Sequence, residues 1–316
     1  MLRKVVLKIL FVIASMKYPK IRKDYRYFIR DNYYCRIRQI RFFFNDFVFR
    51  KKYKVISFQG EFDQELRYVI PFAYWHYLNG TLKKTISSHN TRDFYFFSPD
   101  HEERFQKRIW ELSYNNYEVP NMTHSASFSY SKWAHVPFKS QYRNETFTYH
   151  KPILIIANKY NIEWDASPIN YISLEVLDQI IKKYTNKYQI IYNRPLSNQI
   201  VTDNSEINDL GDHEWLKTNH PEVLLFNDLY EENKKGVHNF NHLQLMVYAN
   251  SDHFISVHGG TGAFASYFGG TNIILSKKGV EHELNEFSTI IPQLSGARIL
   301  HAKTETEILD YMAQYY

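Results

Sequence analysis

The stretch that decides the fold, residues 251–287, reads SDHFISVHGGTGAFASYFGGTNIILSKKGVEHELNEF. A short apolar run, Phe254 to Val257, predicts a strand that leads into the glycine loop His258-Gly259-Gly260-Thr261-Gly262. The small residues from Ala263 to Phe268 predict a helix, and Ile273 to Leu275 predict a second strand. A strand, a glycine loop and a helix N-terminus in this order offer backbone N–H groups and a positive dipole end to a phosphate. The alternative is that the glycines only form a tight turn between strand and helix.

The sequence before this stretch alternates between strand and helix patterns. Apolar runs predict strands in KPILIIANKYN (151–161), YQIIYNRP (188–195) and HPEVLLFNDLY (220–230). Helices are predicted from Leu174 to Tyr184, with Ser173 as N-cap, and in NFNHLQLMVYANS (239–251). Repeated alternation of this kind is typical of a parallel α/β domain.

The N-terminal half shows a weaker form of the same alternation. Val55 to Phe58 predicts a strand, and Gln64 to Asn79 predicts an apolar helix that ends at Gly80. TLKKTISS (81–88) predicts a strand, and Ser98-Pro99-Asp100 is expected to open a helix that reaches Trp110. The chain of 316 residues is long enough for two domains. We expect a basic and aromatic region over 1–54, one α/β domain over 55–145 and another over 146–316, joined by a linker near 139–150.

Composition restricts the partners. The net charge of +6 suits an anionic partner, and Cys35 is the only cysteine, which excludes an intrachain disulfide. Apolar residues recur at helical spacing over residues 2–13, in a run too short to span a bilayer. Residues 17–54 are dense in Arg, Lys, Tyr and Phe, as in surfaces that face anionic lipid. Two alternatives are packing on the domain and stacking on single-stranded RNA. We expect contact with an anionic membrane surface and no nucleic acid partner.

The run from Ser256 to Ala263, together with YFGGTNIIL (267–275) and the acidic loop Glu281-His282-Glu283, resembles the donor site of GT-B glycosyltransferases. It is also similar to heptosyltransferases and polysaccharide-export glycosyltransferases of bacteria. The resemblance implies two Rossmann-like α/β domains that face each other across a cleft. It also implies that the glycine loop and its helix hold the diphosphate of a nucleotide sugar. A carboxylate in the later loop, Glu281 or Glu283, would hold a ribose or sugar hydroxyl.

Further candidates follow from where the predicted strands end. Arg194 ends one strand and could offset the diphosphate charge, or it could form a surface salt bridge. His258 could donate to the donor, or it could be a core histidine. Asn227 and its neighbour Asp228 could border the base or ribose pocket, and the loop at 281–283 could simply be solvated.

The aspartates that could bind a metal ion are isolated in the sequence. Asp93, Asp100 and Asp203 stand apart, with no DxD motif in a metal-binding context, so we expect metal-independent transfer with the nucleotide sugar as substrate and no cofactor.

Glu61 and Asp63 follow the first predicted strand, where open sheets bind ligands, and one of them is the predicted general base. The alternative is that Asp63 caps a helix and Glu61 stabilises its dipole. His101 and His124 are further candidates for the base.

Together these features predict an inverting glycosyltransferase that uses a nucleotide-sugar donor and a glycan or lipid-linked acceptor. We expect it to build a cell-surface polysaccharide from the cytoplasmic side, peripheral to the inner face of a bacterial membrane. One alternative is a nucleotide-sugar epimerase of the same fold. The other is a non-catalytic adaptor that binds a membrane or nucleic acid and retains a nucleotide-binding fold.

Overall fold

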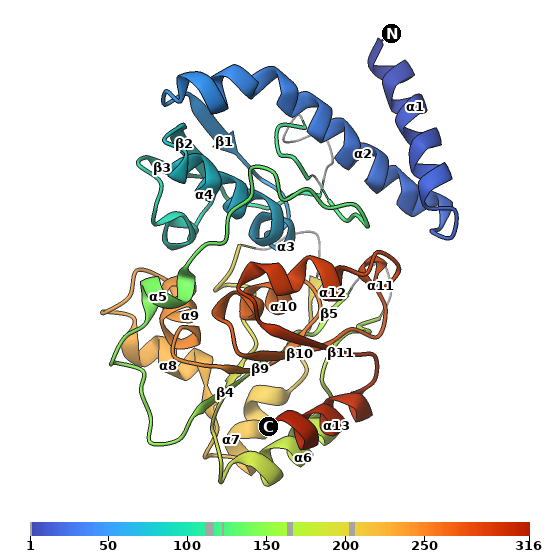
Figure 1. Cartoon of the computed structure of the whole chain (residues 1–316). Helices are drawn as coiled ribbons and strands as arrows, with labels where there is room; N and C mark the ends of the chain where they lie inside the picture. The colour runs from blue at the N-terminus through green and yellow to red at the C-terminus, as the bar shows by residue number, and fades with distance from the viewer. Residues whose placement is uncertain (1, 111–116, 122, 163–166, 202–205) are drawn as a thin grey trace. The chain divides into compact units, whose positions relative to one another are not determined.

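The computed structural model describes residues 2–110, 117–121, 123–162, 167–201 and 206–316, so Asp203 lies outside the described residues. The protein has an α/β fold with parallel sheets and helices (Figure 1). Its chain forms two compact units: Met1–Val136 with Gly279–Ile290, and Pro137–Lys278 with Ile291–Tyr316. The boundary therefore falls at Val136 rather than at residue 145. The return of 279–290 to the first unit was not predicted, and residues 1–54 belong to that unit.

The first unit combines a small sheet with helices. Within the described residues, β1 (Lys54–Ser57), β2 (Leu82–Ser88) and β3 (His101–Phe105) pair in parallel in the order β1-β2-β3. The helical elements of this unit, including short 3₁₀ and π turns, are α1 (Leu2–Lys17), α2 (Lys23–Gln39), η1 (Ile40–Phe42), η2 (Phe44–Phe49), α3 (Phe62–Gln64), η3 (Glu65–Val69), α4 (Ile70–Leu78), η4 (Arg92–Tyr95), α11 (Val280–Glu283) and α12 (Glu286–Thr289).

The helix predicted over 64–79 is interrupted by Pro71. Proline has no N–H and clashes with the carbonyl four residues earlier, which here belongs to Arg67. The residues before α4 accordingly form the π-helical turn η3 instead of a continuous α-helix. The Arg67 carbonyl accepts a hydrogen bond from Trp133 Nε1 at 3.1 Å instead. A side chain distant in sequence therefore supplies the donor that proline cannot.

The helix predicted from Ser98 is wrong, because His101–Phe105 forms strand β3. His101 lies opposite Thr85 of β2, and its Nδ1 is 2.8 Å from Thr85 Oγ1. Its Nε2 is 3.1 Å from Thr91 Oγ1, and burial lowers the pKa of the imidazole. His101 is thus a buried histidine held at both nitrogens, and this pairing stabilises the strand.

The second unit contains a larger sheet (Figure 1). Its strands are β4 (Ile153–Ala157), β6 (Gln189–Asn193), β8 (Leu224–Leu225), β9 (His253–Val257), β10 (Thr271–Leu275) and β11 (Arg298–Ala302). All pair in parallel, and among the described residues their order is β11-β10-β9-β4-β6-β8. Numbered by chain order from the β8 edge, this is the 3-2-1-4-5-6 arrangement of doubly wound sheets. A two-residue antiparallel pair, β5 (Asn161–Ile162) with β7 (Glu206–Ile207), lies apart from it.

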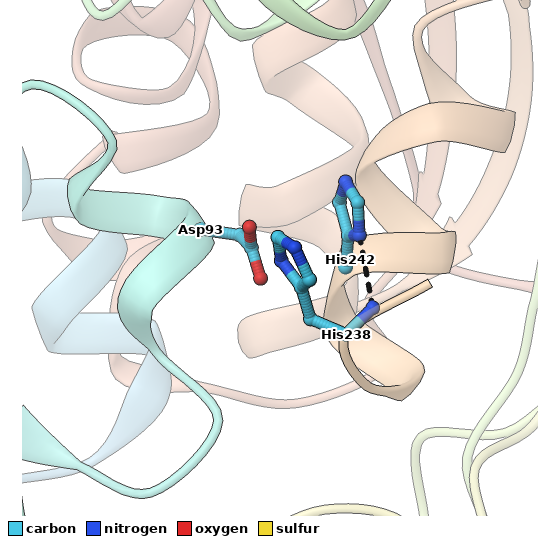
Figure 2. A group of neighbouring side chains, drawn as sticks. All are labelled: Asp93, His238 and His242. Atoms are coloured by element: carbon cyan, nitrogen blue, oxygen red, sulfur yellow. Dashed lines mark hydrogen bonds between the residues drawn. The ribbon is translucent and has the colours of Figure 1, made fainter. Parts of the chain in front are cut away.

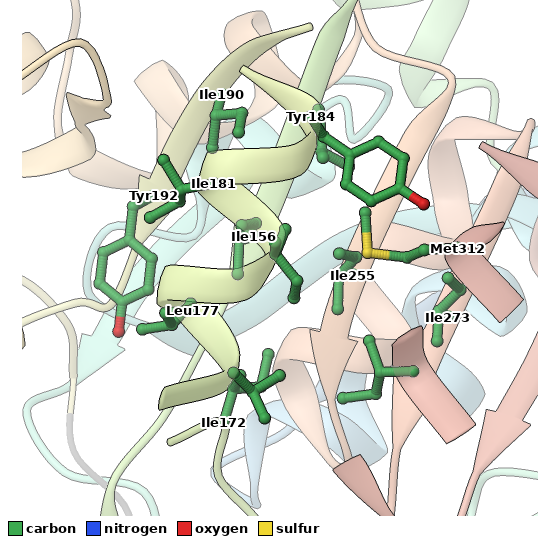
Figure 3. Close-up of a cluster of buried hydrophobic side chains, with 14 of the residues drawn as sticks. Ile156, Ile172, Leu177, Ile181, Tyr184, Ile190, Tyr192, Ile255, Ile273 and Met312 are labelled. Carbon is green, nitrogen blue, oxygen red and sulfur yellow. The ribbon is translucent and has the colours of Figure 1, made fainter. Parts of the chain in front are cut away.

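Helices cover both faces of this sheet. They are α5 (Phe138–Tyr142), α6 (Leu174–Tyr184), α7 (Asp212–Asn219), α8 (Phe226–Asn233), α9 (Phe240–Tyr248), α10 (Gly260–Ala265), η5 (Ser266–Phe268), η6 (Ile291–Leu294) and α13 (Glu305–Tyr315). Side chains from α6 and α13, including Leu177, Ile181 and Met312, pack with Ile156 and Ile255 of the strands in one buried cluster (Figure 3). Burial of this kind contributes about 25 cal/mol per Å² of apolar surface.

The helix starts in this unit follow local sequence signals. Ser173 caps α6, as predicted, with its side chain accepting a hydrogen bond from Val176 N. Asn239 caps α9 by accepting from His242 N at 3.0 Å. His242 Nδ1 in turn accepts from the backbone N of His238, and the two rings stack with centroids 4.4 Å apart (Figure 2). Residues 139–142, at the start of the predicted linker, belong to α5.

In the part of the chain that the structure describes, no helix combines the length and the apolar composition needed to cross a bilayer.

Candidate functional site

At the centre of the large sheet, the order in which the chain adds strands changes direction. From β4 the chain proceeds through β6 to β8 at one edge, and from β9 it proceeds through β10 to β11 at the other. Strand β4 pairs with β9 on one side and β6 on the other, so the loops that follow β4 and β9 leave the sheet side by side. In open parallel sheets ligands bind outside the carboxyl ends of the strands at this reversal. The predicted glycine loop follows β9 directly and therefore lies at that position.

Two glycines of this loop have structural reasons to be glycine. Gly259 has a φ of +93°, which L side chains rarely adopt. A Cβ on Gly262 would lie 3.0 Å from the Val257 carbonyl oxygen and 3.3 Å from Ile274 Cγ2. Gly262 thus lets α10 pack closely on the strands. Gly260 is the first residue of α10 and has a helical backbone, which residues other than glycine can also adopt. A substitution at Gly260 can therefore distinguish a loop that binds a ligand from a loop that only forms a turn.

The polar side chains of the loop are largely engaged within the fold. His258 is buried, and its Nδ1 lies 2.7 Å from Ser276 Oγ at the end of β10. The Thr261 hydroxyl donates to the Val257 carbonyl at 2.6 Å. A phosphate at this loop would therefore be bound by backbone N–H groups rather than by the Thr261 hydroxyl.

A cationic side chain, which the sequence did not single out, lies beside the loop. Lys159 follows β4, and its Nζ lies 3.6 Å from the position of a Cβ built on Gly259. The strand order brings it there, because β4 and β9 are neighbours although about 100 residues separate them in sequence.

Arg194 is buried at the end of β6 and is paired. Its Nε donates to Asp212 at 2.6 Å, its Nη2 contacts both Asp212 and Asp209, and Tyr192 also donates to Asp212. Burial by itself would raise the pKa of Asp212, but the hydrogen bonds from Arg194 and Tyr192 outweigh it and lower the pKa. The carboxylate therefore stays ionised and compensates the guanidinium charge, which fits the salt-bridge alternative, although this pair is buried.

Two amide oxygens at the carboxyl edge of the sheet have no hydrogen-bond partner among the described residues. Asn193 ends β6, and its Nδ2 donates to Tyr248 while its Oδ1 is buried and unpaired. Asn227 lies in the first turn of α8, where its Nδ2 is 3.2 Å from His213 Nδ1 and its Oδ1 is buried and unpaired. Buried acceptors are usually satisfied, so these two oxygens suit donor groups of a ligand or of water.

In the first unit, the predicted base Asp63 belongs to a buried cluster of charges. Arg67, which is fully buried, pairs with Asp63 and with Glu286 of α12. Glu286 also accepts a hydrogen bond from Ser125 N at 3.0 Å. Asp63 therefore does not cap the helix; the N-cap residue of α3 is Glu61, whose side chain makes no capping hydrogen bond. Glu61 Oε2 accepts from Gln64 at 3.3 Å.

His124 lies in the same cluster. Its Nδ1 is 3.3 Å from Glu286 and 3.6 Å from Glu281, and its ring contacts Phe28 edge-on. Burial by itself would lower the pKa of His124, but the carboxylates of Glu286 and Glu281 outweigh it and raise the pKa to about 9. Burial would likewise raise the pKa of Glu286, but Arg67 and His124 lower it. The imidazole is therefore protonated at neutral pH.

The two predicted carboxylates of the loop at 281–283 differ in solvent exposure. Glu281 is buried beside His124, whereas Glu283 is exposed, and both lie in α11 of the first unit. The prediction had placed these carboxylates in the same domain as the glycine loop. Their proximity to His124 was not readable from the sequence, since no spacing rule connects residues so far apart.

The cluster also contains atoms of a kind that binds metal ions. His124, Glu281 and Glu286 offer one nitrogen and two carboxylate oxygens that lie within 4.8 Å of one another. Divalent cations such as Zn²⁺ use this donor set. A cation here would share Glu286 with the Arg67 guanidinium, which already offsets part of the negative charge.

Comparison of the chain with models of known protein families finds no match. Comparison with curated proteins finds none either.

Proposed function

We propose that the protein is a glycosyltransferase that moves a sugar from a nucleotide-sugar donor to a glycan or lipid-linked acceptor. The second unit binds the donor and the first unit supplies the acceptor-side groups, in the manner of the two halves of a GT-B enzyme. Transfer inverts the anomeric centre and needs no metal ion. The enzyme works as a peripheral protein at the inner face of a membrane, where nucleotide sugars and lipid-linked acceptors meet.

The observation that carries the proposal is the position of the glycine loop. The loop from His258 to Gly262 follows β9 where the strand order of a parallel sheet reverses, and the amine of Lys159 lies beside it. Backbone N–H groups and a lysine suit a diphosphate, which carries concentrated negative charge. The unpaired oxygens of Asn193 and Asn227 lie at the same edge of the sheet and suit hydroxyl or amino donors of a nucleoside.

Inverting transfer also needs a base for the acceptor hydroxyl and charge stabilisation for the departing diphosphate. The loop and Lys159 supply the second requirement. For the first we propose Asp63 or Glu61, each of which lies just beyond β1. Asp63 pairs with the Arg67 guanidinium, and a carboxylate is a group that can accept the proton of an acceptor hydroxyl.

The test is a product assay with a panel of nucleotide sugars. The protein is incubated with each one, with and without a bacterial lipid-linked glycan fraction, and free nucleotide and sugar products are measured. We expect free nucleotide from at least one donor, in larger amount when acceptor is present. An altered nucleotide sugar without release of nucleotide would indicate an epimerase and contradict the proposal. No turnover and no binding of any donor would contradict it as well.

A further inference from the structure

Helix α1 carries an apolar stripe that no other part of the described chain covers. Its buried side chains are Leu10 and Ala14, and Ala14 packs with Ile29 of α2 in a small cluster. The large apolar side chains that remain exposed are Leu2, Val5, Ile9, Val12, Ile13 and Met16. Exposure reaches 79% at Leu2 and 78% at Met16.

The spacing of the exposed residues places them on one face. At 3.6 residues per turn, residues 2, 5, 9, 12, 13 and 16 span roughly 100° of the helix surface, on the side opposite Leu10 and Ala14. Figure 1 shows α1 packed through one side on the start of α2. An apolar face of this kind exposed to water along a whole helix marks an interaction surface.

The charges around the stripe identify the partner. Arg3, Lys4, Lys8 and Lys17 are all exposed, and α1 contains no Asp or Glu. Lys20, Arg22 and Lys23 extend the basic segment, and the first acidic residue of the chain is Asp24. A second copy of this helix would bring like charges together, whereas an anionic lipid surface offers both apolar depth and opposite charge.

A second exposed apolar surface of the first unit has the same composition. It contains Phe43, Phe44, Phe47, Val48 and Phe49, which are exposed in and beside η2. The basic residues next to it are Arg41, Arg50, Lys51 and Lys52, all exposed. Aromatic side chains among arginines and lysines are typical of segments that enter the headgroup region of a bilayer.

We propose that α1 lies in the surface of an anionic membrane, with its apolar stripe buried among the lipids and its lysines at the headgroups. This contact specifies the membrane attachment that forms part of the proposed function and rests on it. Vesicle binding tests the contact separately from sugar transfer. It attaches the first unit reversibly, because each apolar side chain and each lysine adds only a small amount of binding.

The test is flotation of the full chain with vesicles. One set contains phosphatidylcholine and phosphatidylglycerol, and the other contains phosphatidylcholine alone. We expect the protein to float with the anionic set at low salt and to bind the neutral set much more weakly. Burying one Ile or Val contributes an amount of free energy equivalent to about tenfold in binding. The double variant Ile9→Asp/Val12→Asp should therefore lose about a hundredfold in partitioning.

Two further variants keep the test specific. Lys4→Gln/Lys8→Gln should weaken binding at low salt and differ little from the parent at high salt, where charges are screened. Leu196→Asp, at an exposed apolar residue of the second unit, is the matched control and should bind as the parent does. Equal urea midpoints would show that the variants remain folded. A parent that does not float, or a floating Ile9→Asp/Val12→Asp variant, would overturn the proposal. A concentration-dependent dimer abolished by that variant would do so too.

Discussion

The two candidates for the general base, Asp63 and Glu61, have different side-chain contacts, so their substitutions are compared in both turnover and stability. Asp63 is paired with the buried Arg67, whereas Glu61 contacts Gln64. Asp63→Asn and Glu61→Gln keep size and remove basicity. One of the two should lower kcat by about 10²-fold or more, the usual scale for a general base. Donor affinity should stay constant, because the donor binds in the other unit.

Stability must be measured beside turnover for these variants. Asp63→Asn also weakens a pair with Arg67, which should cost about 1–3 kcal/mol in the free energy of unfolding. Turnover is therefore compared per folded molecule. If both variants keep near-normal kcat, neither residue is the base. His124, a further candidate from the sequence, does not replace them, because its imidazole is protonated at neutral pH.

The raised pKa of His124 leads us to expect that the free energy of unfolding decreases at alkaline pH. Its pKa in the folded protein is about 9, above the ordinary value of 6.5. A raised pKa contributes stability that is fully present below about pH 6.5 and is lost as pH rises through about 9. The shift corresponds to a contribution on the order of 3 kcal/mol. Urea unfolding should therefore show a larger loss of stability between pH 6.5 and about 9.5 in the parent than in His124→Gln.

Glu286→Gln provides the matching control, since it removes the main carboxylate beside the imidazole. In this variant the pKa of His124, followed by its NMR titration, should fall toward its ordinary value. A parent and a His124→Gln variant with identical pH profiles of stability would contradict this assignment.

Some of these residues could be found from the sequence, and others could not. The pairing of Asp63 with Arg67 is a contact between residues four apart on a helix, which spacing alone can suggest. The Ser173 cap was predicted for the same local reason. The contact of His124 with Glu286 joins residues 162 positions apart, and it depends on 279–290 returning to the first unit. No local pattern encodes such a return.

At the scale of elements, strong apolar runs determined the predictions that succeeded. Strands β4, β6, β9 and β10 are buried nearly throughout, so apolar residues predominate in their sequences, which are ILIIA, QIIYN, HFISV and TNIIL. Strand β3, with the sequence HEERF, has no such run and was mistaken for a helix. Its position depends on pairing with β2, which is tertiary information.

The interruption before α4 leads to a test of its own. Trp133→Phe removes the side-chain donor that reaches the Arg67 carbonyl. The free energy of unfolding should fall by about 0.5–1.5 kcal/mol, the usual net contribution of one hydrogen bond. Trp110→Phe, at a tryptophan that is 47% exposed, is the control and should change stability little. Equal stability of the two variants would show that the Trp133 hydrogen bond contributes nothing measurable.

At the scale of the whole molecule, we expect catalysis without a metal ion. The glycine loop and Lys159 offset the diphosphate charge, so turnover should continue in excess EDTA. Loss of activity in EDTA that Mn²⁺ or Mg²⁺ restores would contradict this prediction. It would also direct attention to His124, Glu281 and Glu286, whose donor atoms lie close enough to share a cation.

In the proposed function, the loop from His258 to Gly262 binds the diphosphate of a nucleotide sugar. Gly260→Val is the variant that tests this binding, because Gly260 has a helical backbone, whereas Gly259 and Gly262 are glycine for structural reasons. Gly236→Val is the matched control, at an exposed glycine in ordinary contact with its surroundings. Binding of nucleoside diphosphates and nucleotide sugars is measured by thermal shift, since a ligand at a hundred times its Kd adds about 2.7 kcal/mol of stability. We predict a shift for the parent and for Gly236→Val and none for a folded Gly260→Val. An unchanged shift in Gly260→Val, or no shift with any nucleotide in the parent, would contradict the proposed diphosphate site.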